Sequence, residues 1–249
     1  MKLAGVEIAR IGLGTNRLTN TPANVRFIKA AVDAGVQLID TAHLYTGGKS
    51  EETIGEALSP PHDGVVIATK GGVNGGAPDV IRAEIQESLR KLRAKRIDLY
   101  YLHRVDANVR LEDSLGAIKE SVDDGVIGAV GLSQVGVEQI ERARRIVPVA
   151  VVQNMYNLGE RQNDPVVDYC TREGIPFVAF YPLHGVEGGR AEEIARRLHA
   201  TTHQIALAWL LKRSPVMLAI PGTLSLGHLQ ENLAAQKLEL TDKDFEALR

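Results

Sequence analysis

The chain has a single cysteine, Cys170, which excludes a disulfide bond within it. This residue ends the stretch Val166-Val167-Asp168-Tyr169-Cys170, which we expect to be helical. A free cysteine in such a position usually behaves as a small buried hydrophobe. We therefore interpret Cys170 as part of the core and not as a reactive thiol.

An excess of charge of one sign is also missing. There are 29 Lys and Arg residues against 31 Asp and Glu, a formal net charge of -2, so no broad positive field for holding nucleic acid is expected. No apolar run reaches the roughly 20 residues that a membrane span needs, and the N-terminal residues lack the apolar segment of a signal peptide. We expect a cytoplasmic protein, a monomer or weak homo-oligomer, that binds neither nucleic acid nor membrane.

What the sequence does contain is a regular alternation of two kinds of segment. Short apolar runs typical of buried strands occupy residues 11–15, 37–41, 65–70, 97–103, 128–133, 149–154, 176–182 and 216–221. Segments whose apolar residues recur at helical spacing, and whose ends carry residues typical of helix starts and stops, occupy residues 23–34, 50–58, 78–92, 111–123, 137–146, 165–173, 190–199, 202–212 and 226–236. The alternation predicts an α/β fold, a single (β/α)8 TIM barrel, whose usual size of about 250 residues matches this chain.

An open, doubly wound parallel sheet is the structural alternative. Such sheets often bind dinucleotides through a G-x-G-x-x-G turn that opens a helix. Here Gly12-Leu13-Gly14-Thr15-Asn16-Arg17 lacks the third glycine, and no helix is expected to start there. No linker, low-complexity segment or block of charge suggests a second domain, so one domain is expected over residues 1–249.

Polar side chains stand at the ends of several of these apolar runs. Asp40 ends one run and Lys70 the next, while His103 and Asn154 end two later ones. The carboxyl ends of the strands are where a parallel α/β barrel carries its active site. Tyr45 follows Asp40 by five residues, which adds a phenol to the carboxylate, ammonium, imidazole and amide.

At Asp40, Tyr45, Lys70 and His103 the chain resembles the aldo-keto reductases, NAD(P)H-dependent carbonyl reductases built on such a barrel. The resemblance covers essentially the whole chain. Its further motifs are Gly12-Leu13-Gly14-Thr15, Gly131-Leu132-Ser133-Gln134, Val152-Gln153-Asn154-Met155-Tyr156-Asn157, Ala179-Phe180-Tyr181-Pro182-Leu183 and Ile220-Pro221-Gly222-Thr223 with Glu231-Asn232. It also implies a short N-terminal hairpin, with Gly5 at its turn, that closes the barrel floor.

Carbonyl reduction by hydride leaves negative charge on oxygen, so the site needs a proton donor. We assign this role to Tyr45, whose ordinary pKa of about 10 a neighbouring Lys70 ammonium is expected to lower. Asp40 is expected to keep Lys70 charged and oriented, since burying an unpaired ammonium is costly. His103 is expected to orient the substrate oxygen. These four roles match the tetrad of the resembled family.

The resemblance also implies a surface for the cofactor, NADPH as first choice with NADH possible. It assigns the nicotinamide carboxamide to Ser133, Gln134 and Gln153, where Gln134 departs from the usual asparagine, and a stacking ring to Phe180. Gly222 and His228 stand where many relatives carry a lysine and an arginine for the 2′-phosphate. The full set is Gly14, Thr15, Asp40, Ser133, Gln134, Gln153, Phe180, Tyr181, Pro182, Leu183, Ile220, Gly222, Thr223, Ser225, His228, Glu231 and Asn232.

The substrate expected from these assignments is a small aldehyde or ketone. The loops at residues 104–110 and 183–189 are short, and few residues follow the last expected helix, so the pocket should be open and tolerant. Histidine spacing gives no H-E-x-x-H pattern, and no metal is expected. Two other functions stay open: a Schiff-base aldolase with Lys70 as nucleophile, and a cofactor-sensing regulatory subunit with little turnover.

Overall fold

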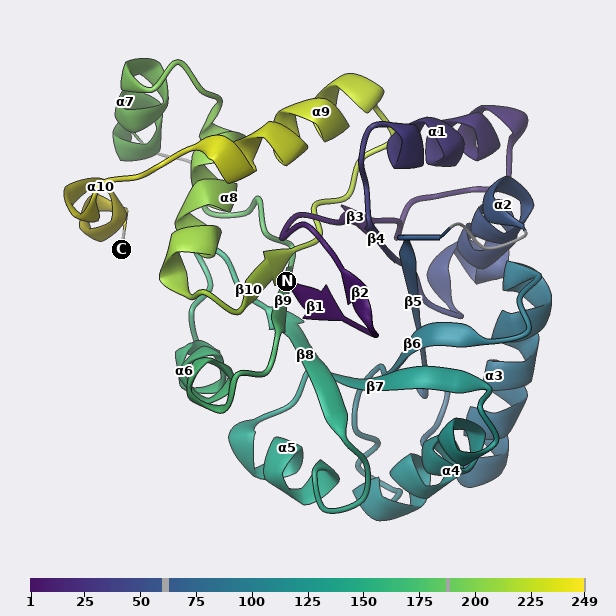
Figure 1. Cartoon of the computed structure of the whole chain (residues 1–249). Helices are drawn as coiled ribbons and strands as arrows, with labels where there is room; N and C mark the ends of the chain where they lie inside the picture. The colour runs from purple at the N-terminus through teal and green to yellow at the C-terminus, as the bar shows by residue number, and fades with distance from the viewer. Residues whose placement is uncertain (60–62, 187–188, 249) are drawn as a thin grey trace.

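Eight parallel strands form one sheet that closes on itself (Figure 1). The computed structural model describes residues 1–59, 63–186 and 189–248. The strands are β3 (Leu13–Gly14), β4 (Leu38–Asp40), β5 (Val66–Gly71), β6 (Ile97–Leu102), β7 (Ile127–Ser133), β8 (Val149–Met155), β9 (Phe177–Phe180) and β10 (Met217–Ala219). They neighbour one another in chain order from β3 to β10, so the predicted (β/α)8 barrel is confirmed.

The barrel closes where the first strand meets the last. Isolated parallel bridges join Ile11 to Ala219 and Gly14 to Gly222. The amide of Gly14 donates to the Pro221 carbonyl oxygen at 3.1 Å. A Cβ at Gly14 would lie 2.7 Å from the backbone oxygen of Ile220, so only glycine fits at this seam.

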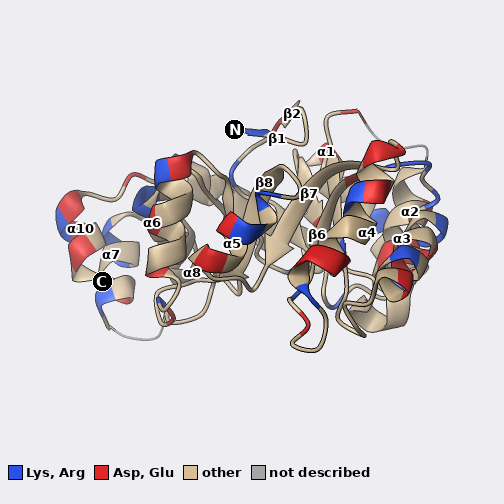
Figure 2. Ribbon diagram, turned by 90° about the horizontal axis from the view of Figure 1, so that it is seen from below, with Lys and Arg blue, Asp and Glu red and all other residues tan. Residues whose placement is uncertain are grey.

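The N-terminal hairpin forms as expected. Strands β1 (Lys2–Leu3) and β2 (Val6–Glu7) pair antiparallel across Ala4 and Gly5, both of which have positive φ as a two-residue hairpin turn of this hand requires. Leu3 and Ile8 are buried against residues that fill the barrel interior, including Leu38, Val66, Leu99, Val151 and Leu218. The hairpin therefore closes the floor at one end of the barrel, which Figure 2 shows from the side.

Helices surround the barrel and bury a second apolar layer against it. They are α1 (Pro22–Asp33), α2 (Lys49–Leu58), α3 (Pro78–Leu92), α4 (Leu111–Asp123), α5 (Val137–Ala143), α6 (Asp164–Glu173), α7 (Gly189–Arg197), α8 (Thr202–Arg213), α9 (Leu226–Ala234) and α10 (Asp242–Ala247). Cys170 is fully buried in α6, as predicted, and burial raises the pKa of its thiol to about 12. Within the described residues, no helix has the length and apolar character that crossing a membrane requires.

Several helical features differ from the prediction. Helix α7 ends at Arg197 and not at residue 199, because His199 has a left-handed φ of 52°. Helix α5 ends at Ala143 and not at residue 146, because Pro148 disfavours helical backbone at Val147 and the chain tightens into turns before it. Short 3-10 helices occur at Tyr45–Gly48 (η1) and Ala235–Lys237 (η2), the second ending the helix expected to reach 236.

Helix α10 was not expected. Thr241 caps it, and the ring of Phe245 stacks on Trp209 with 5.4 Å between ring centroids. Trp209 is 1% exposed and also stacks on Tyr156, so its ring is part of the core.

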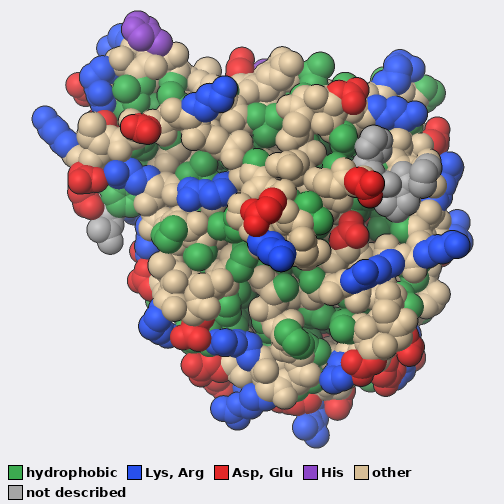
Figure 3. Space-filling view, in the orientation of Figure 1, with side chains coloured by type: hydrophobic (Ala, Val, Ile, Leu, Met, Phe, Trp, Pro, Cys, Tyr) green, Lys and Arg blue, Asp and Glu red, His purple; other side chains and the backbone are tan. Residues whose placement is uncertain are grey.

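Basic and acidic side chains are intermixed over the face around the hairpin (Figure 3). Figure 2 shows the same mixture along the helices that surround the barrel. Neither view shows a broad region of one sign, in keeping with the near balance of charges in the sequence.

Candidate active site

A cavity of about 330 Å³ lies at the carboxyl ends of the strands, and we call it the mouth cavity. This end of a (β/α)8 barrel carries the active site in essentially every characterised enzyme of the fold. Its lining is Gly14, Thr15, Asn16, Asp40, Leu44, Tyr45, Val73, His103, Arg104, Ser133, Gln134, Gln153, Phe180, Tyr181, Pro182, Ile220 and Gly222. Three of the four predicted catalytic residues therefore line one cavity, and the fourth, Lys70, lies against them.

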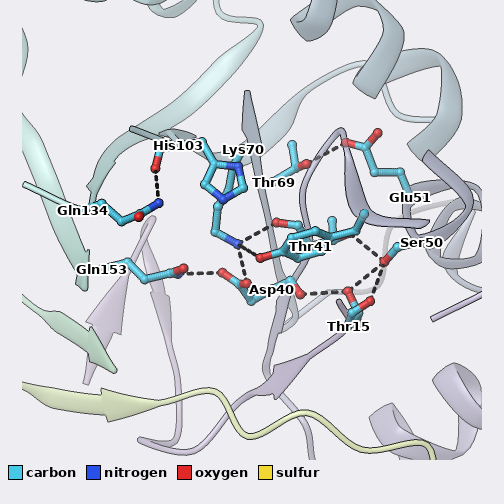
Figure 4. A network of polar contacts seen from close by, with 11 residues as sticks. Thr15, Asp40, Thr41, Ser50, Glu51, Thr69, Lys70, His103, Gln134 and Gln153 are labelled. Carbon is cyan, nitrogen blue, oxygen red and sulfur yellow. Dashed lines mark hydrogen bonds and ion pairs between the residues drawn. The ribbon is translucent and has the colours of Figure 1, made fainter. Parts of the chain in front are cut away.

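Lys70 lies at the centre of a buried polar network (Figure 4). Its side chain is fully buried, and its ammonium donates to Asp40 Oδ1 at 2.5 Å, the Thr41 carbonyl oxygen at 2.8 Å and the Tyr45 hydroxyl at 3.4 Å. An ammonium has three donors, so all three are used. The other Asp40 oxygen accepts from Gln153 Nε2 at 2.7 Å. The phenol, amine and carboxylate that the sequence suggested thus form one connected group.

Hydroxyl groups hold the loop that carries Tyr45. Thr15 Oγ1 donates to the Asp40 carbonyl oxygen at 2.8 Å. Ser50 Oγ, at the start of α2, lies 2.8 Å from Thr15 Oγ1 and 2.7 Å from Thr41 Oγ1 (Figure 4). All of these atoms are buried, where a hydrogen bond left unmade is costly. The segment from Asp40 to Ser50 is therefore fixed at both of its ends.

Burial sets the protonation of this group more strongly than the sequence suggested. The pKa of Tyr45 is raised above its ordinary value because burial penalises the charged phenolate; Lys70 pulls the pKa down, as expected, but does not outweigh burial. The expected net lowering is therefore wrong. Burial lowers the pKa of Lys70, yet Asp40 and Tyr45 together outweigh it and the net pKa is raised. A neutral phenol beside a charged ammonium is the resting state.

His103 faces Tyr45 across the mouth cavity. The two rings meet edge to face with their centroids 6.0 Å apart. The His103 amide donates to the Gly71 carbonyl oxygen at 2.8 Å, which fixes its backbone beside the strand that carries Lys70. Burial, then the charges of Lys70 and Arg104, lower the pKa of His103 to about 3. Its imidazole is therefore neutral, with one N–H to donate and one nitrogen to accept.

Gln134 lines the mouth cavity and has a left-handed backbone conformation. Its φ is 56°, which is uncommon for a residue with a Cβ and marks a constrained position. Its side-chain amide donates to the His103 carbonyl oxygen at 3.2 Å, and its backbone amide donates to the Gln153 carbonyl oxygen at 3.0 Å. The longer side chain thus ties the end of β7 to the loop after β6, while its neighbour Ser133 is buried and lines the cavity.

A second cavity of about 430 Å³ continues from the mouth cavity along the rim, and we call it the rim cavity. The two share Gly14, Thr15, Asn16 and Gly222. The rim cavity is also lined by Arg17, Leu18, Thr223, Leu224, Ser225 and His228. The linings of these two adjoining cavities extend from Tyr45 to the first turn of α9, where Ser225 caps the helix by accepting from the His228 amide at 3.4 Å.

Most of the residues predicted for the cofactor line one of these two cavities. Phe180, Tyr181, Pro182 and Ile220 line the mouth cavity, and Thr223, Ser225 and His228 line the rim cavity. Leu183, Glu231 and Asn232 line neither. Leu183 packs against the apolar core, Glu231 accepts from Gln204 through its backbone oxygen, and Asn232 is buried in α9. The loop predicted at residues 183–189 includes residues 187 and 188, which lie outside the described residues.

Several lining residues were not identified from the sequence. Arg17, Val73 and Arg104 lie in loops that directly follow β3, β5 and β6. Their position just after a strand was the available signal, since these loops build the active-site face of the fold. No group of three or more His, Cys, Asp or Glu suited to a metal ion occurs in the part of the chain that the structure describes.

Comparison with known proteins shows which family this chain is related to. A model of the aldo/keto reductase family matches residues 10–188 and 187–249. An uncharacterised oxidoreductase of Schizosaccharomyces pombe is 37% identical over 270 residues, covering 100% of this chain and 88% of its own. Pyridoxine 4-dehydrogenase of Escherichia coli is 34% identical over 242 residues, covering 90% of this chain and 85% of its own.

Solved structures of aldo-keto reductases are similar to this chain in fold. A thermostable aldo-keto reductase in complex with the inhibitor epalrestat has a TM-score of 0.93 at 30% identity, covering 100% of this chain and 97% of its own. An aldo/keto reductase from Klebsiella pneumoniae in complex with NADP and acetate has a TM-score of 0.89 at 27% identity, covering 97% and 90%. This chain belongs to the aldo/keto reductase family.

Proposed function

We propose that this protein reduces the carbonyl group of small aldehydes or ketones to alcohols, with NADPH as the preferred reductant. The observation that carries the proposal is the position of the Lys70 ammonium, bonded to Asp40 at 2.5 Å and to Tyr45 at 3.4 Å beneath the mouth cavity. We also propose that residues 1–249 form one catalytic domain, because the strands and helices of one barrel run from end to end of the chain.

The chain's own residues would manage the proton and the developing charge. When bound, the cofactor supplies the hydride. The Tyr45 hydroxyl then gives its proton to the carbonyl oxygen, and the Lys70 ammonium stabilises the phenolate that remains. Asp40 keeps Lys70 charged and aimed, because an unpaired buried ammonium would lose its proton. His103 is neutral and can donate its N–H to the substrate oxygen, which fixes the carbonyl beside Tyr45.

The two cavities fit a dinucleotide. Ser133 and Gln153 offer polar atoms at the mouth, and the ring of Phe180 lines the same cavity. At Gly222 a Cβ would lie 3.4 Å from both Asn16 Oδ1 and the Gly14 carbonyl oxygen, so glycine leaves room where the two cavities join. In the rim cavity, Arg17 is an exposed, permanently charged side chain beside Thr223, Ser225 and His228. These groups suit phosphate oxygens and support NADPH, the cofactor form found in the Klebsiella pneumoniae relatives.

The aldolase alternative is disfavoured by the state of Lys70. A Schiff-base nucleophile must be a neutral, accessible amine. Here the amine is fully buried, donates three hydrogen bonds, and has a raised pKa. A regulatory subunit that only binds the cofactor has no need of a proton donor. Here the Tyr45 phenol accepts a hydrogen bond from the Lys70 ammonium, an arrangement suited to proton transfer, which disfavours the regulatory alternative.

Turnover with a panel of small aldehydes and ketones tests the proposal. We expect loss of NADPH absorbance together with formation of the matching alcohol, and no reaction without the nicotinamide. Borohydride treatment with substrate should leave Lys70 unmodified. Substrate trapped on Lys70 would favour the aldolase, and tight NADPH binding with no product from any carbonyl would favour the regulatory subunit.

A further inference from the structure

Arg104 directly follows His103 at the end of β6 and lines the mouth cavity with Tyr45. Among the described residues that line this cavity, the only charged side chains are Asp40 and Arg104. Asp40 is neutralised by its ion pair with Lys70. The guanidinium of Arg104 is therefore the charge on the described lining of this cavity that no ion pair neutralises.

No carboxylate in the described part of the chain lies within ion-pair distance of Arg104. The oxygens of Asp106, two residues further on, accept from the backbone amides of Gly76 at 2.9 Å and Asn108 at 2.8 Å. These two amides are the main cause of the lowered pKa of Asp106, and the charge of Arg104 makes a smaller contribution without forming an ion pair. Within the described residues the guanidinium makes one hydrogen bond, from Nη2 to the Val73 carbonyl oxygen at 3.2 Å. This leaves most of its five donors free.

The bond to Val73 also holds the side chain in position. Val73 lies in the loop after β5 and lines the same cavity, so the guanidinium spans the gap between two neighbouring loops. The remaining wall is neutral: His103 is uncharged, and Leu44, Phe180 and Tyr181 are apolar or aromatic. A fixed planar cation beside an uncharged wall favours a carboxylate, which can accept two parallel hydrogen bonds from it.

We propose that Arg104 selects carbonyl substrates that carry a carboxylate away from the reacting group. The inference rests on the proposed function, because it names the substrate class for that same site. In this arrangement the carbonyl oxygen lies between Tyr45 and His103 while the carboxylate of the same molecule binds the guanidinium. Arg104 acts on substrate choice and takes no part in proton transfer.

A matched pair of aldehydes tests the proposal: 4-formylbenzoate and its neutral methyl ester. The ester is the more electrophilic aldehyde, so carbonyl reactivity alone favours it. We expect kcat/KM for the carboxylate to exceed that for the ester by about tenfold or more, chiefly through a lower KM, which corresponds to about 1.4 kcal/mol. Higher ionic strength should reduce the ratio, since exposed charges are screened.

Variants assign the effect to this side chain. Arg104→Met should bring the ratio of the two kcat/KM values close to one, and Arg104→Lys should restore part of it. Arg110→Met is the matched control: Arg110 is exposed in the same loop, pairs with Glu112 at 3.7 Å and does not line the cavity. It should leave the ratio unchanged.

The outcomes separate this inference from the proposed function. Reduction of the ester with no preference for the carboxylate, or an equal loss with both aldehydes in Arg104→Met, would overturn the role of Arg104 while leaving the reductase assignment intact. If neither aldehyde is reduced, calorimetric binding of 4-(hydroxymethyl)benzoate and its methyl ester to the protein with NADP⁺ decides. Arg104-dependent preference for the acid supports the inference, and equal affinities refute it.

Discussion

The Asp40→Asn variant tests how much the buried ion pair between Asp40 and Lys70 contributes to the free energy of unfolding. Lys70 is fully buried, and Asp40 is its only charged partner among the described residues. Removing one member of a buried pair typically costs 3–5 kcal/mol, because an uncompensated charge is left inside. Lys70 keeps its bonds to the Thr41 carbonyl and the Tyr45 hydroxyl, so we expect a loss near the lower end, about 3 kcal/mol.

Urea unfolding followed by the fluorescence of Trp209, the only tryptophan, measures this loss. With an m-value of about 3 kcal/mol/M, the midpoint should fall by about 1 M. Asp242→Asn is the control, since it removes an exposed partner of Lys212 and should not move the midpoint measurably.

The pH dependence of this loss of unfolding free energy is a more specific test of the ion pair. In the native protein the pKa of Lys70 is raised above 10.5, so its stabilising contribution persists at lower pH and is lost only as pH rises through the folded value. Burial is the largest single influence on the pKa of Lys70, so we expect the pKa to fall below 10.5 when Asp40 is removed. The variant should then gain stability as pH rises toward 10.5, and the difference from wild type should shrink. A constant difference, or an unchanged midpoint at neutral pH, would refute the reasoning.

Three further predictions concern cofactor, pH and backbone. Arg17→Met should weaken NADPH binding about tenfold in a fluorescence titration, because it removes a cation that lines the rim cavity; an unchanged Kd would contradict this role. The pKa of His103 is about 3, so burying it neutral contributes stability above pH 6.5, and this contribution is lost as the pH falls toward 3. His103 also stays neutral between about pH 5 and 8, so the kcat/KM profile over that range should keep its shape in His103→Gln. Gly14→Ala should destabilise by about 1–3 kcal/mol through contact with the Ile220 carbonyl, whereas Gly116→Ala, with open space in the middle of α4, should stabilise by about 0.5–1 kcal/mol in urea unfolding.

The sequence predicted the barrel because its main signal is local. Each buried strand is a short apolar run, and its last residue emerges at the same end of the barrel, which brought Asp40, Lys70 and His103 together. Helix boundaries were predicted where capping residues or proline mark them, as at Pro22 and Pro78. The helix around Phe245 was missed because it is only six residues long, and the two apolar residues that pack it on the core, Phe245 and the C-cap residue Leu248, are too few to show a helical period.

The sequence could not give the balance between opposing effects in the site. That Lys70 pulls the pKa of Tyr45 down was correct, but the larger opposing effect of burial depends on how closely the loops enclose the phenol. Arg17 and Arg104 were likewise ordinary loop cations in the sequence. Only the meeting of the loops after β3, β5, β6 and β10 shows that these cations line cavities.

The role of Tyr45 is tested most directly by the rate of NADPH oxidation with a small aldehyde in Tyr45→Phe, measured beside the NADPH dissociation constant. Phenylalanine keeps the ring and removes only the hydroxyl that lies 3.4 Å from Lys70. We predict that kcat falls by about 100-fold or more, as loss of a general acid requires, while the dissociation constant stays close to that of wild type. Full activity in this variant would contradict the account.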